Sequence, residues 1–321
     1  MILRASEMKI DPFIIFLPVV VLLAWFIPGP AHVLPLEAMT SAGISLVFFF
    51  YGVKLRPSAL RSGLRNGKLH LVIQAFTFLV FPVAVLLLQP LFVSREIWLG
   101  LFFLAALPST VSTSVVMVSM AGGNLPAAIF NASISGLIGI FVTPLWMSLF
   151  LQHGGGDMSP VYSGLLFEIL VPVTAGLLLQ RWLGQTVQKF RSWFTRFDQA
   201  VILVVIYKSF VHSFESGIFG GIRPVQLLML GFWAIFLFVC IYGLIFFTVR
   251  RMGFSREDRI TALFCGTKKS LVHGTVFSKV LWGGSSATGI ILLPLMIFHA
   301  LQILVIGFIA GRYAGEEKGN R

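Results

Sequence analysis

Charged residues and cysteines are both scarce in this sequence of 321 residues. Only 11% of the residues are charged, against about 25% in typical soluble domains. The two cysteines, Cys240 and Cys265, both fall in apolar segments. Two thiols placed in this way indicate neither a disulfide framework nor a metal-binding cluster.

The sequence also lacks the common motifs of hydrolytic enzymes. It contains no His-Glu-x-x-His, no Gly-x-Ser-x-Gly and no pair of aspartates within an apolar segment. The first two motifs are signatures of zinc proteases and of serine hydrolases with a nucleophile elbow. We therefore predict that the chain is not an enzyme.

Apolar runs, in contrast, recur along the whole chain, and 57% of the residues are hydrophobic. A membrane-spanning helix needs about 20 mostly apolar residues. The sequence predicts an all-α polytopic membrane protein with ten transmembrane helices embedded in a lipid bilayer. The expected spans cover residues 12–27, 37–53, 69–90, 97–121, 125–151, 159–180, 199–219, 224–249, 260–282 and 286–310.

The net charge of +12 has a simple explanation in such a protein. A basic soluble protein would raise the question of nucleic acid, but basic residues of membrane proteins gather in cytoplasmic loops. With ten spans and an internal N-terminus, 18 of the 24 lysine and arginine residues fall in the cytoplasmic regions. We therefore expect both termini in the cytoplasm and no nucleic-acid partner.

Two of the expected spans contain a polar break. Residues 107–114 combine Pro108 with a run of hydroxyl side chains, which can bond the carbonyls that the proline leaves free. Residues 264–274 hold two glycines, Lys268, Lys269 and His273. Because charges are costly inside a membrane, they usually face a cavity or a partner rather than lipid. We therefore expect each break to contribute half of a substrate site.

A short internal repeat relates the two halves of the chain. The pattern Gly-Ile-x-x-x-Pro-Leu begins at Gly139 and again at Gly289, in the last span of each half. Five spans on each side of the link 153–157 force the second copy to be inverted. We predict two inverted five-helix repeats, residues 1–152 and 157–321, within a single integral membrane domain. Inverted repeats with broken helices are a transporter arrangement, with the site at the membrane midplane.

The breaks also carry a family resemblance. The run Leu107–Ser114, the run Gly123-Asn124-Leu-Pro-Ala-Ala and the run Cys265–Leu271 resemble the bile acid:sodium symporter family, and more closely its bacterial SBF-like symporter branch. The stretch from Gly63 to Pro82 resembles that branch too. The resemblance covers nearly the whole chain. It implies panel and core domains, discontinuous helices 4 and 9 that cross, and alternating-access transport across the bacterial inner membrane.

The resemblance also implies a secondary active transporter of a small organic anion, without an organic cofactor. Sodium-using members coordinate the ion with hydroxyl, amide and acidic side chains around the crossing, and Ser114 stands where such a ligand is expected. Phe264 stands at the position of the acid, and Lys268 at that of a neutral amide. A lysine there supplies the positive charge from the protein itself, so sodium coupling is in doubt. Na⁺ and H⁺ both stay candidates, since a desolvated lysine releases its proton more readily.

Together these observations predict a substrate and ion site formed by both breaks and two neighbouring spans. Its expected members are Gln74, Ser109, Thr110, Ser112, Ser114, Asn131, Gly266, Thr267, Lys268, Lys269, Ser270 and His273. The alternative is structural: lysines paired with carbonyls, hydroxyls that satisfy the proline break, and a histidine that bridges helices.

Two alternative functions stay open at this point. One is a membrane scaffold or regulator without transport of its own. The other is a cation/proton antiporter of related architecture, which normally needs an intramembrane acid that the spans 97–121 and 260–282 lack. The sequence does not predict the oligomeric state.

Overall fold

The structure, a computed structural model, describes residues 12–55, 66–92, 94–110, 112–151, 163–164, 166–221, 224–282 and 285–319. Within these ranges the regular elements are all helical. The first half of the chain contains α1 (Pro12–Phe26), α2 (Pro30–Val33), α3 (Leu36–Lys54), α5 (Gly67–Ala75), the π-helix η1 (Phe76–Val80), α6 (Phe81–Leu87), the 3-10 turn η2 (Gln89–Leu91), α7 (Arg95–Ala106), α8 (Ser112–Met120) and α9 (Leu125–Leu151). The second half contains the π-helix η4 (Leu166–Leu170), α11 (Val171–Lys189), α12 (Arg191–Glu215), the 3-10 turn η5 (Ile218–Gly221), α13 (Pro224–Arg251), α14 (Arg256–Gly266), α15 (Leu271–Trp282) and α16 (Thr288–Gly319).

Several of these helices have the length and apolarity of membrane spans. In the described part of the chain seven stretches qualify: Leu36–Lys54, Gly67–Leu87, Leu125–Phe150, Leu166–Lys189, Arg191–Glu215, Val225–Arg251 and Thr288–Ala314. The helix α1 is apolar but shorter. The helices α7, α8, α14 and α15 are also short, since each is one piece of an interrupted segment. The prediction of an all-helical, multi-pass membrane protein is therefore confirmed.

The two interruptions have local causes in the sequence. The helix α7 ends at Ala106 because Leu107, which precedes Pro108, adopts an extended conformation with ψ of 152°. The helix α14 starts at a cap in which Ser255 accepts a hydrogen bond from the Asp258 N–H, and it ends at Gly266. The chain becomes helical again at Ser112 in α8 and at Leu271 in α15.

The two interruptions lie directly against each other. The Ser270 N–H donates to the Pro108 carbonyl at 2.9 Å, and the Ser109 hydroxyl donates to the Cys265 carbonyl at 2.6 Å. Each break thus supplies partners for backbone groups that the other leaves without a helical hydrogen bond. The predicted pairing of the breaks in residues 107–114 and 264–274 is a feature of the structure.

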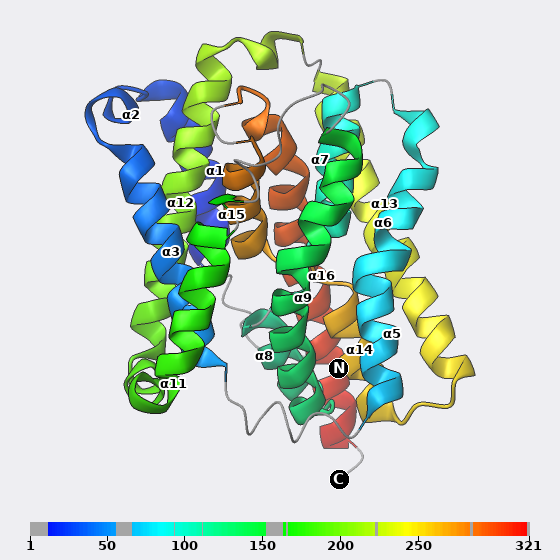
Figure 1. The fold of residues 1–321 in the computed structure, drawn as a ribbon. Coiled ribbons are helices and arrows are strands. Elements are labelled where there is room, and N and C mark those ends of the chain that lie inside the picture. The colour runs from blue at the N-terminus through cyan, green and yellow to red at the C-terminus, as the bar shows by residue number, and fades with distance from the viewer. Residues whose placement is uncertain are drawn as a thin grey trace.

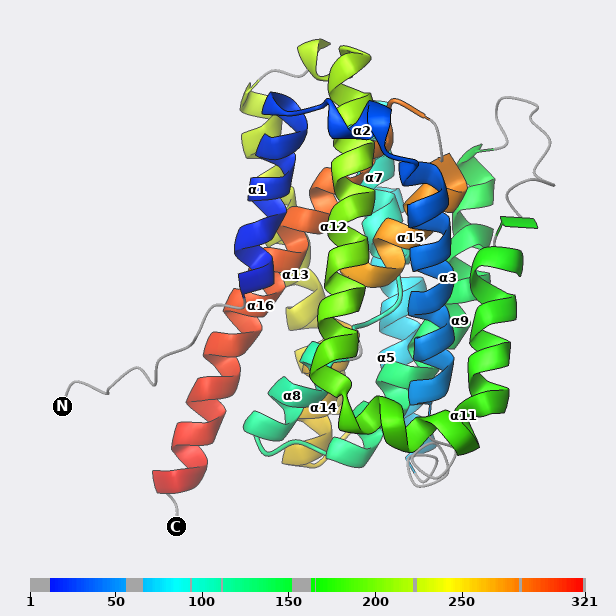
Figure 2. The ribbon, with the colours of Figure 1, turned by 90° about the vertical axis from the view of Figure 1, so that its left-hand side faces the viewer.

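The helices divide into two packing groups (Figure 1). In the first group α3 packs along α11 with η4, and α1 packs along α12. The second group comprises α5 to α9 and α13 to α16 and contains both breaks. The helix α12 joins the groups through its contacts with α15 and α16, and Figure 2 shows α12 running beside α15.

One expectation about the spans was wrong. The expected spans 159–180 and 199–219 leave residues 181–198 as a loop, but the structure makes this region helical: α11 continues to Lys189, and only Phe190 separates it from α12. Apolar residues recur at spacings of three and four in this region, at Leu183, Val187, Phe190 and Phe194. This pattern favours an amphipathic helix over a loop, and the end of α11 turns sideways to meet α12 (Figure 2).

Glycines allow α3 and α11 to approach backbone to backbone. A Cβ atom on Gly176 would overlap the Phe49 carbonyl oxygen and lie 3.0 Å from the Val53 nitrogen, and one on Gly52 would lie 2.9 Å from the Leu177 nitrogen. Small residues at such contacts are a recurring device of membrane helix packing.

We expect Gly176→Ala to lower the free energy of unfolding by about 1–3 kcal/mol, because the added methyl group meets backbone that cannot yield. Thermal unfolding of the purified protein in detergent measures the effect. Gly231→Ala in α13 is the matched control, since a Cβ there meets nothing within 4 Å. Equal melting temperatures for the two variants would contradict the packing argument.

Candidate functional site

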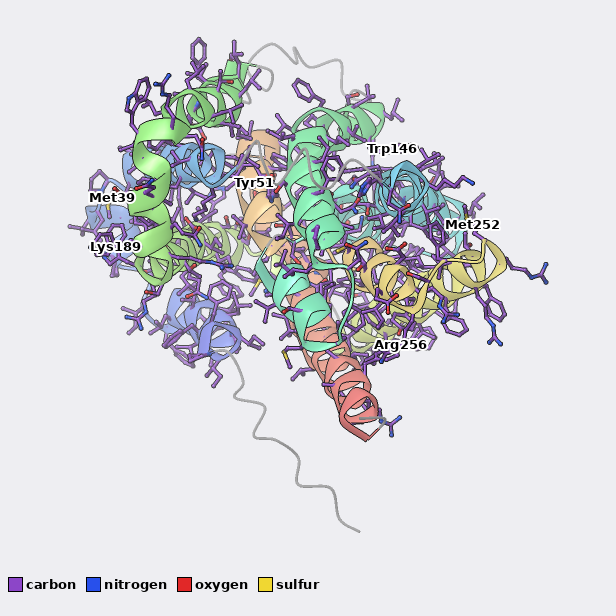
Figure 3. All side chains as sticks on the ribbon, turned by 90° about the horizontal axis from the view of Figure 1, so that it is seen from below. Met39, Tyr51, Trp146, Lys189, Met252 and Arg256 are labelled. Atoms are coloured by element: carbon purple, nitrogen blue, oxygen red, sulfur yellow. The ribbon has the colours of Figure 1, made fainter. Side chains whose placement is uncertain are left out.

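A cavity of about 210 Å³ lies between the two helix groups, beside the paired breaks. Seen from below, Tyr51, which is on the same helix α3 as Met39, lies toward the helices that carry Trp146 and Arg256 (Figure 3). From the first group the lining residues are Phe13, Val47, Phe48, Tyr51, Lys54, Leu55, Thr195, Asp198, Gln199 and Ile202. From the second group they are Thr110, Thr113, Ser133, Ser270, Leu271, Val272, His273, His299 and Ile303.

Aromatic rings form one wall of this cavity. Phe48 contacts His273 edge to face, with ring centroids 5.4 Å apart, and stacks on Phe277 at 6.5 Å. The Tyr51 ring also contacts His273, with centroids 5.4 Å apart. Such a wall offers flat apolar surface to a ligand, while its polar atoms stay few and fixed.

His273 and Asp198 each present a buried polar atom without a hydrogen-bond partner among the described residues that line the cavity. The His273 Nδ1 bonds the Ser270 hydroxyl at 2.9 Å, whereas its Nε2 is buried and has no hydrogen-bond partner among the described residues. Tyr51 does not use this nitrogen, because its hydroxyl donates to the Ser133 carbonyl at 2.7 Å. Buried polar atoms are nearly always satisfied, so the Nε2 atom is available for a ligand or for water.

Hydroxyl groups of the first break form a short chain beside the cavity. The Thr110 hydroxyl bonds those of Thr113 and Ser114, both at 2.8 Å. The Ser114 hydroxyl also approaches the Phe264 carbonyl at 3.4 Å, which is long for a hydrogen bond between two oxygens. Thr110 and Thr113 line the cavity, and Ser114 lies fully buried behind them.

Lys269 is buried in a cage of backbone carbonyls. Its Nζ donates to the carbonyls of Thr77, Ala105 and Leu107 at 2.7, 2.6 and 2.9 Å, and it lies 4.6 Å from the ring centroid of Phe81. Ala105 and Leu107 are at the end of α7, where the helix dipole favours a cation. Thr77 lies in the π-helix η1. Lys269 therefore fits the structural alternative, in which a buried lysine is paired with backbone carbonyls.

Lys268 points in another direction. Its Nζ donates to the Thr113 carbonyl and to Met117 Sδ, both at 2.9 Å. Like Lys269 it is fully buried, does not line the cavity, and forms no ion pair within the described part of the chain. Lys268 therefore lies behind Thr113, one residue away from the cavity wall.

Several other predicted residues do not line the cavity. Gln74 donates to Asn131 Oδ1 at 3.1 Å, and the Asn131 amide in turn bonds His70 at 2.8 Å. The Thr267 hydroxyl caps the Leu263 carbonyl at 2.6 Å. A Cβ on Gly266 would lie 2.9 Å from Ile245. The side chain of Ser112 is outside the described structure. Of the predicted set, the cavity lining contains Thr110, Ser270 and His273.

The sequence analysis missed the half of the cavity that comes from α3 and α12. Tyr51, and the Lys54–Asp198 ion pair at 2.9 Å, lie on these two helices. A signal was present: Tyr51 and Lys54 are three residues apart on α3, as are Thr195 and Asp198 on α12, so each pair shares a helix face. Without knowledge of which helices face each other, that spacing alone does not identify a site.

Comparison with known proteins assigns the family. Residues 11–315 match the family described as SBF-like CPA transporter family. "Uncharacterized protein PA2026" of Pseudomonas aeruginosa is 40% identical over 313 residues, which cover 95% of this chain and 93% of that protein. "Putative symporter YfeH" of Escherichia coli is 36% identical over 309 residues, 95% of this chain and 93% of that protein.

"Sodium/bile acid cotransporter 7" of Danio rerio is 33% identical over 284 residues, which cover 86% of this chain and 84% of that protein. These matches confirm the predicted resemblance and the prediction that the chain is a transporter and not an enzyme. Because the similarity extends over almost the entire sequence, the chain belongs to the SBF-like CPA transporter family.

Proposed function

We propose that this protein is a secondary active transporter of a small, amphipathic organic anion, which binds in the cavity between Phe48 and the paired breaks. The observation that carries the proposal is the unpartnered Nε2 of His273 beside the aromatic wall of the cavity. Rings of Phe48 and Tyr51 would hold the apolar body of the substrate, and His273 its polar end.

Two helix N-termini support an anionic substrate. The helices α8 and α15 both begin at the breaks, and residues of their first turns, Thr113 and His273 among them, line the cavity. Free N–H groups and the helix dipole favour negative charge at such ends. The buried ammonium of Lys268, which holds the Thr113 carbonyl, adds positive charge behind the same wall.

We further propose the architecture that the sequence predicts. The group of α1, α3, α11 and α12 would be the panel domain, and the group with the breaks the core domain. Residues 1–152 and 157–321 would form two inverted five-helix repeats, with α7–α8 and α14–α15 as the discontinuous helices 4 and 9. Alternating access would then move one group against the other, in the bacterial inner membrane, with both termini in the cytoplasm.

For the coupling ion, we propose that Lys268 takes the place of a sodium ion. Relatives named as sodium/bile acid cotransporters make Na⁺ a candidate here, and Ser114 with the Phe264 carbonyl offers oxygen ligands. The Lys268 ammonium, however, bonds the carbonyl one residue before Ser114. Lys269 would have a separate role, the neutralisation of the end of α7.

Uptake by proteoliposomes tests the transport function itself. We expect accumulation of at least one carboxylated or sulfonated organic anion, driven by a gradient that does not have to be sodium. Na⁺ and pH gradients are imposed separately across a panel of anions, with a neutral analogue of each as control. Absence of gradient-dependent flux for every anion would refute the proposal.

We expect Lys268→Gln to abolish uptake or to make it dependent on Na⁺, because the variant removes the charge that would replace the ion. Initial rates are measured with and without Na⁺, and thermal unfolding checks that the variant is folded. Lys189→Gln on α11, which is exposed, is the matched control. Unchanged, sodium-independent uptake by Lys268→Gln would contradict this role.

We expect His273→Phe to raise KM about tenfold or more while kcat changes less. The ring keeps its aromatic contacts with Phe48, but the substrate loses a hydrogen bond, and one to a charged group contributes about 1.5–3 kcal/mol. Kinetics of uptake separate the two parameters. A loss confined to kcat, with KM unchanged, would place His273 outside the substrate site.

A further inference from the structure

A second cavity, of about 190 Å³, lies farther along the same helices. Its lining includes His32, Thr40, Val205, Lys208, Glu215 and Lys279. One face of α12 serves both cavities, since Asp198 and Ile202 line the first, while Val205 and Lys208 line the second at the same helical spacing. The two cavities therefore lie on one line between the helix groups.

An apolar plug separates the two cavities. On α3, Ile44 lies between Thr40 of the second cavity and Val47 of the first, and it is completely buried. On α15, buried Phe277 lies between His273 and Lys279 and stacks on Phe48. The paired breaks are thus reached from the first cavity, and this plug closes the way from the second.

Lys279 ties the two groups together on the far side of the plug. From α15 its Nζ donates to both carboxylate oxygens of Glu168 in η4, at 2.8 and 3.0 Å, and to the hydroxyl of Ser41 in α3 at 2.5 Å. It also lies 3.4 Å from the Glu37 carboxylate. These partners of Lys279 are distant from it in the sequence.

Other ion pairs around these cavities stay within the first group. Lys208 pairs with Glu37, and His32 with Glu215. At the first cavity, Lys54 and Asp198 belong to α3 and α12, which are both in the first group. Among the described residues, the cluster of Lys279 with Glu168, Ser41 and Glu37 is therefore the charged link that must break when the groups separate at this end.

We infer that the Lys279–Glu168 ion pair is a latch. While the pair is formed, the second cavity stays separated from the breaks, so the latch determines which of the two cavities is open to them. The inference rests on the proposed transport function. The side chain of Lys279 is only 11% exposed, so separation leaves a charged group that has lost three hydrogen bonds in a poorly hydrated place. A ligand or variant that weakens the latch shifts the population toward the state open at the second cavity.

The carboxylates around Lys208 and Lys279 argue against a substrate site in the second cavity. Glu37, Glu168 and Glu215 outnumber Lys208 and Lys279, and the lysines already have carboxylate partners. An incoming anion would have to displace one of these carboxylates. The cluster fits a closure better than a binding site for an anion.

Cysteine accessibility tests the latch without any substrate. The background is a variant in which Cys240 and Cys265 are replaced by Ala. Two single cysteine probes are then introduced on α12: Gln199→Cys reports the accessibility of the first cavity, and Val205→Cys reports that of the buried end of the second. The purified protein in detergent is labelled with a water-soluble maleimide. For Glu168→Gln and for Lys279→Met we expect labelling at Val205→Cys to rise about tenfold, a shift of about 1.4 kcal/mol, and labelling at Gln199→Cys to fall.

The reciprocal change separates a latch from general loosening, which would raise labelling at both probes. Lys279→Glu combined with Glu168→Lys should restore the original pattern, and Glu215→Gln, which breaks a pair inside the first group, should leave it unchanged. Unaltered labelling, or a parallel rise at both probes, would overturn the inference. Because no transported molecule is involved, a failed uptake assay with a reciprocal labelling pattern would refute the proposed function and not the latch.

Discussion

The structure depends on the mutual satisfaction of backbone groups at two broken helices. A lipid bilayer has no water to bond free N–H and C=O groups, so irregular chain at that depth must find its partners inside the protein. Here the Ser270 N–H bonds the Pro108 carbonyl, and the ammonium of Lys269 bonds two carbonyls at the end of α7. These bonds hold the breaks together, and the position of the breaks determines where a cavity with two helix N-termini can form.

The two helix groups contribute different surfaces to the cavity. The second helix group contributes the breaks and His273, whose atoms are fixed by hydrogen bonds. The first group contributes the rings of Phe48 and Tyr51 from a single regular helix, α3. Because the two surfaces belong to different packing groups, the group motion proposed above would change the contacts of a bound molecule with α3 while its contacts with the breaks stay the same.

The sequence predicts features that an unusual local composition marks, such as the two breaks. It does not predict contacts between residues that are distant in the chain. Pro108 among hydroxyls, and two lysines in an apolar segment, identify both breaks without any structure. The acceptors of Lys269 could not be predicted, because they are backbone carbonyls, which every residue possesses. Tyr51 is inconspicuous in an apolar helix until α3 faces the breaks. The pair Glu168–Lys279 joins residues separated by 111 positions, and neither residue has a local pattern that names the other.

The cage around Lys269 also bears on how the protein is made. Its three acceptors, at Thr77, Ala105 and Leu107, are synthesised long before the lysine that binds them. Until the ribosome has passed residue 269, the end of α7 has no ammonium to bond, and a lysine delivered to the bilayer without these carbonyls would be an isolated charge in lipid. The acceptor carbonyls are thus synthesised first and the ammonium group afterwards. Neither half of the chain can therefore complete its broken helix alone, and the final fold waits for the arrival of α14 and α15.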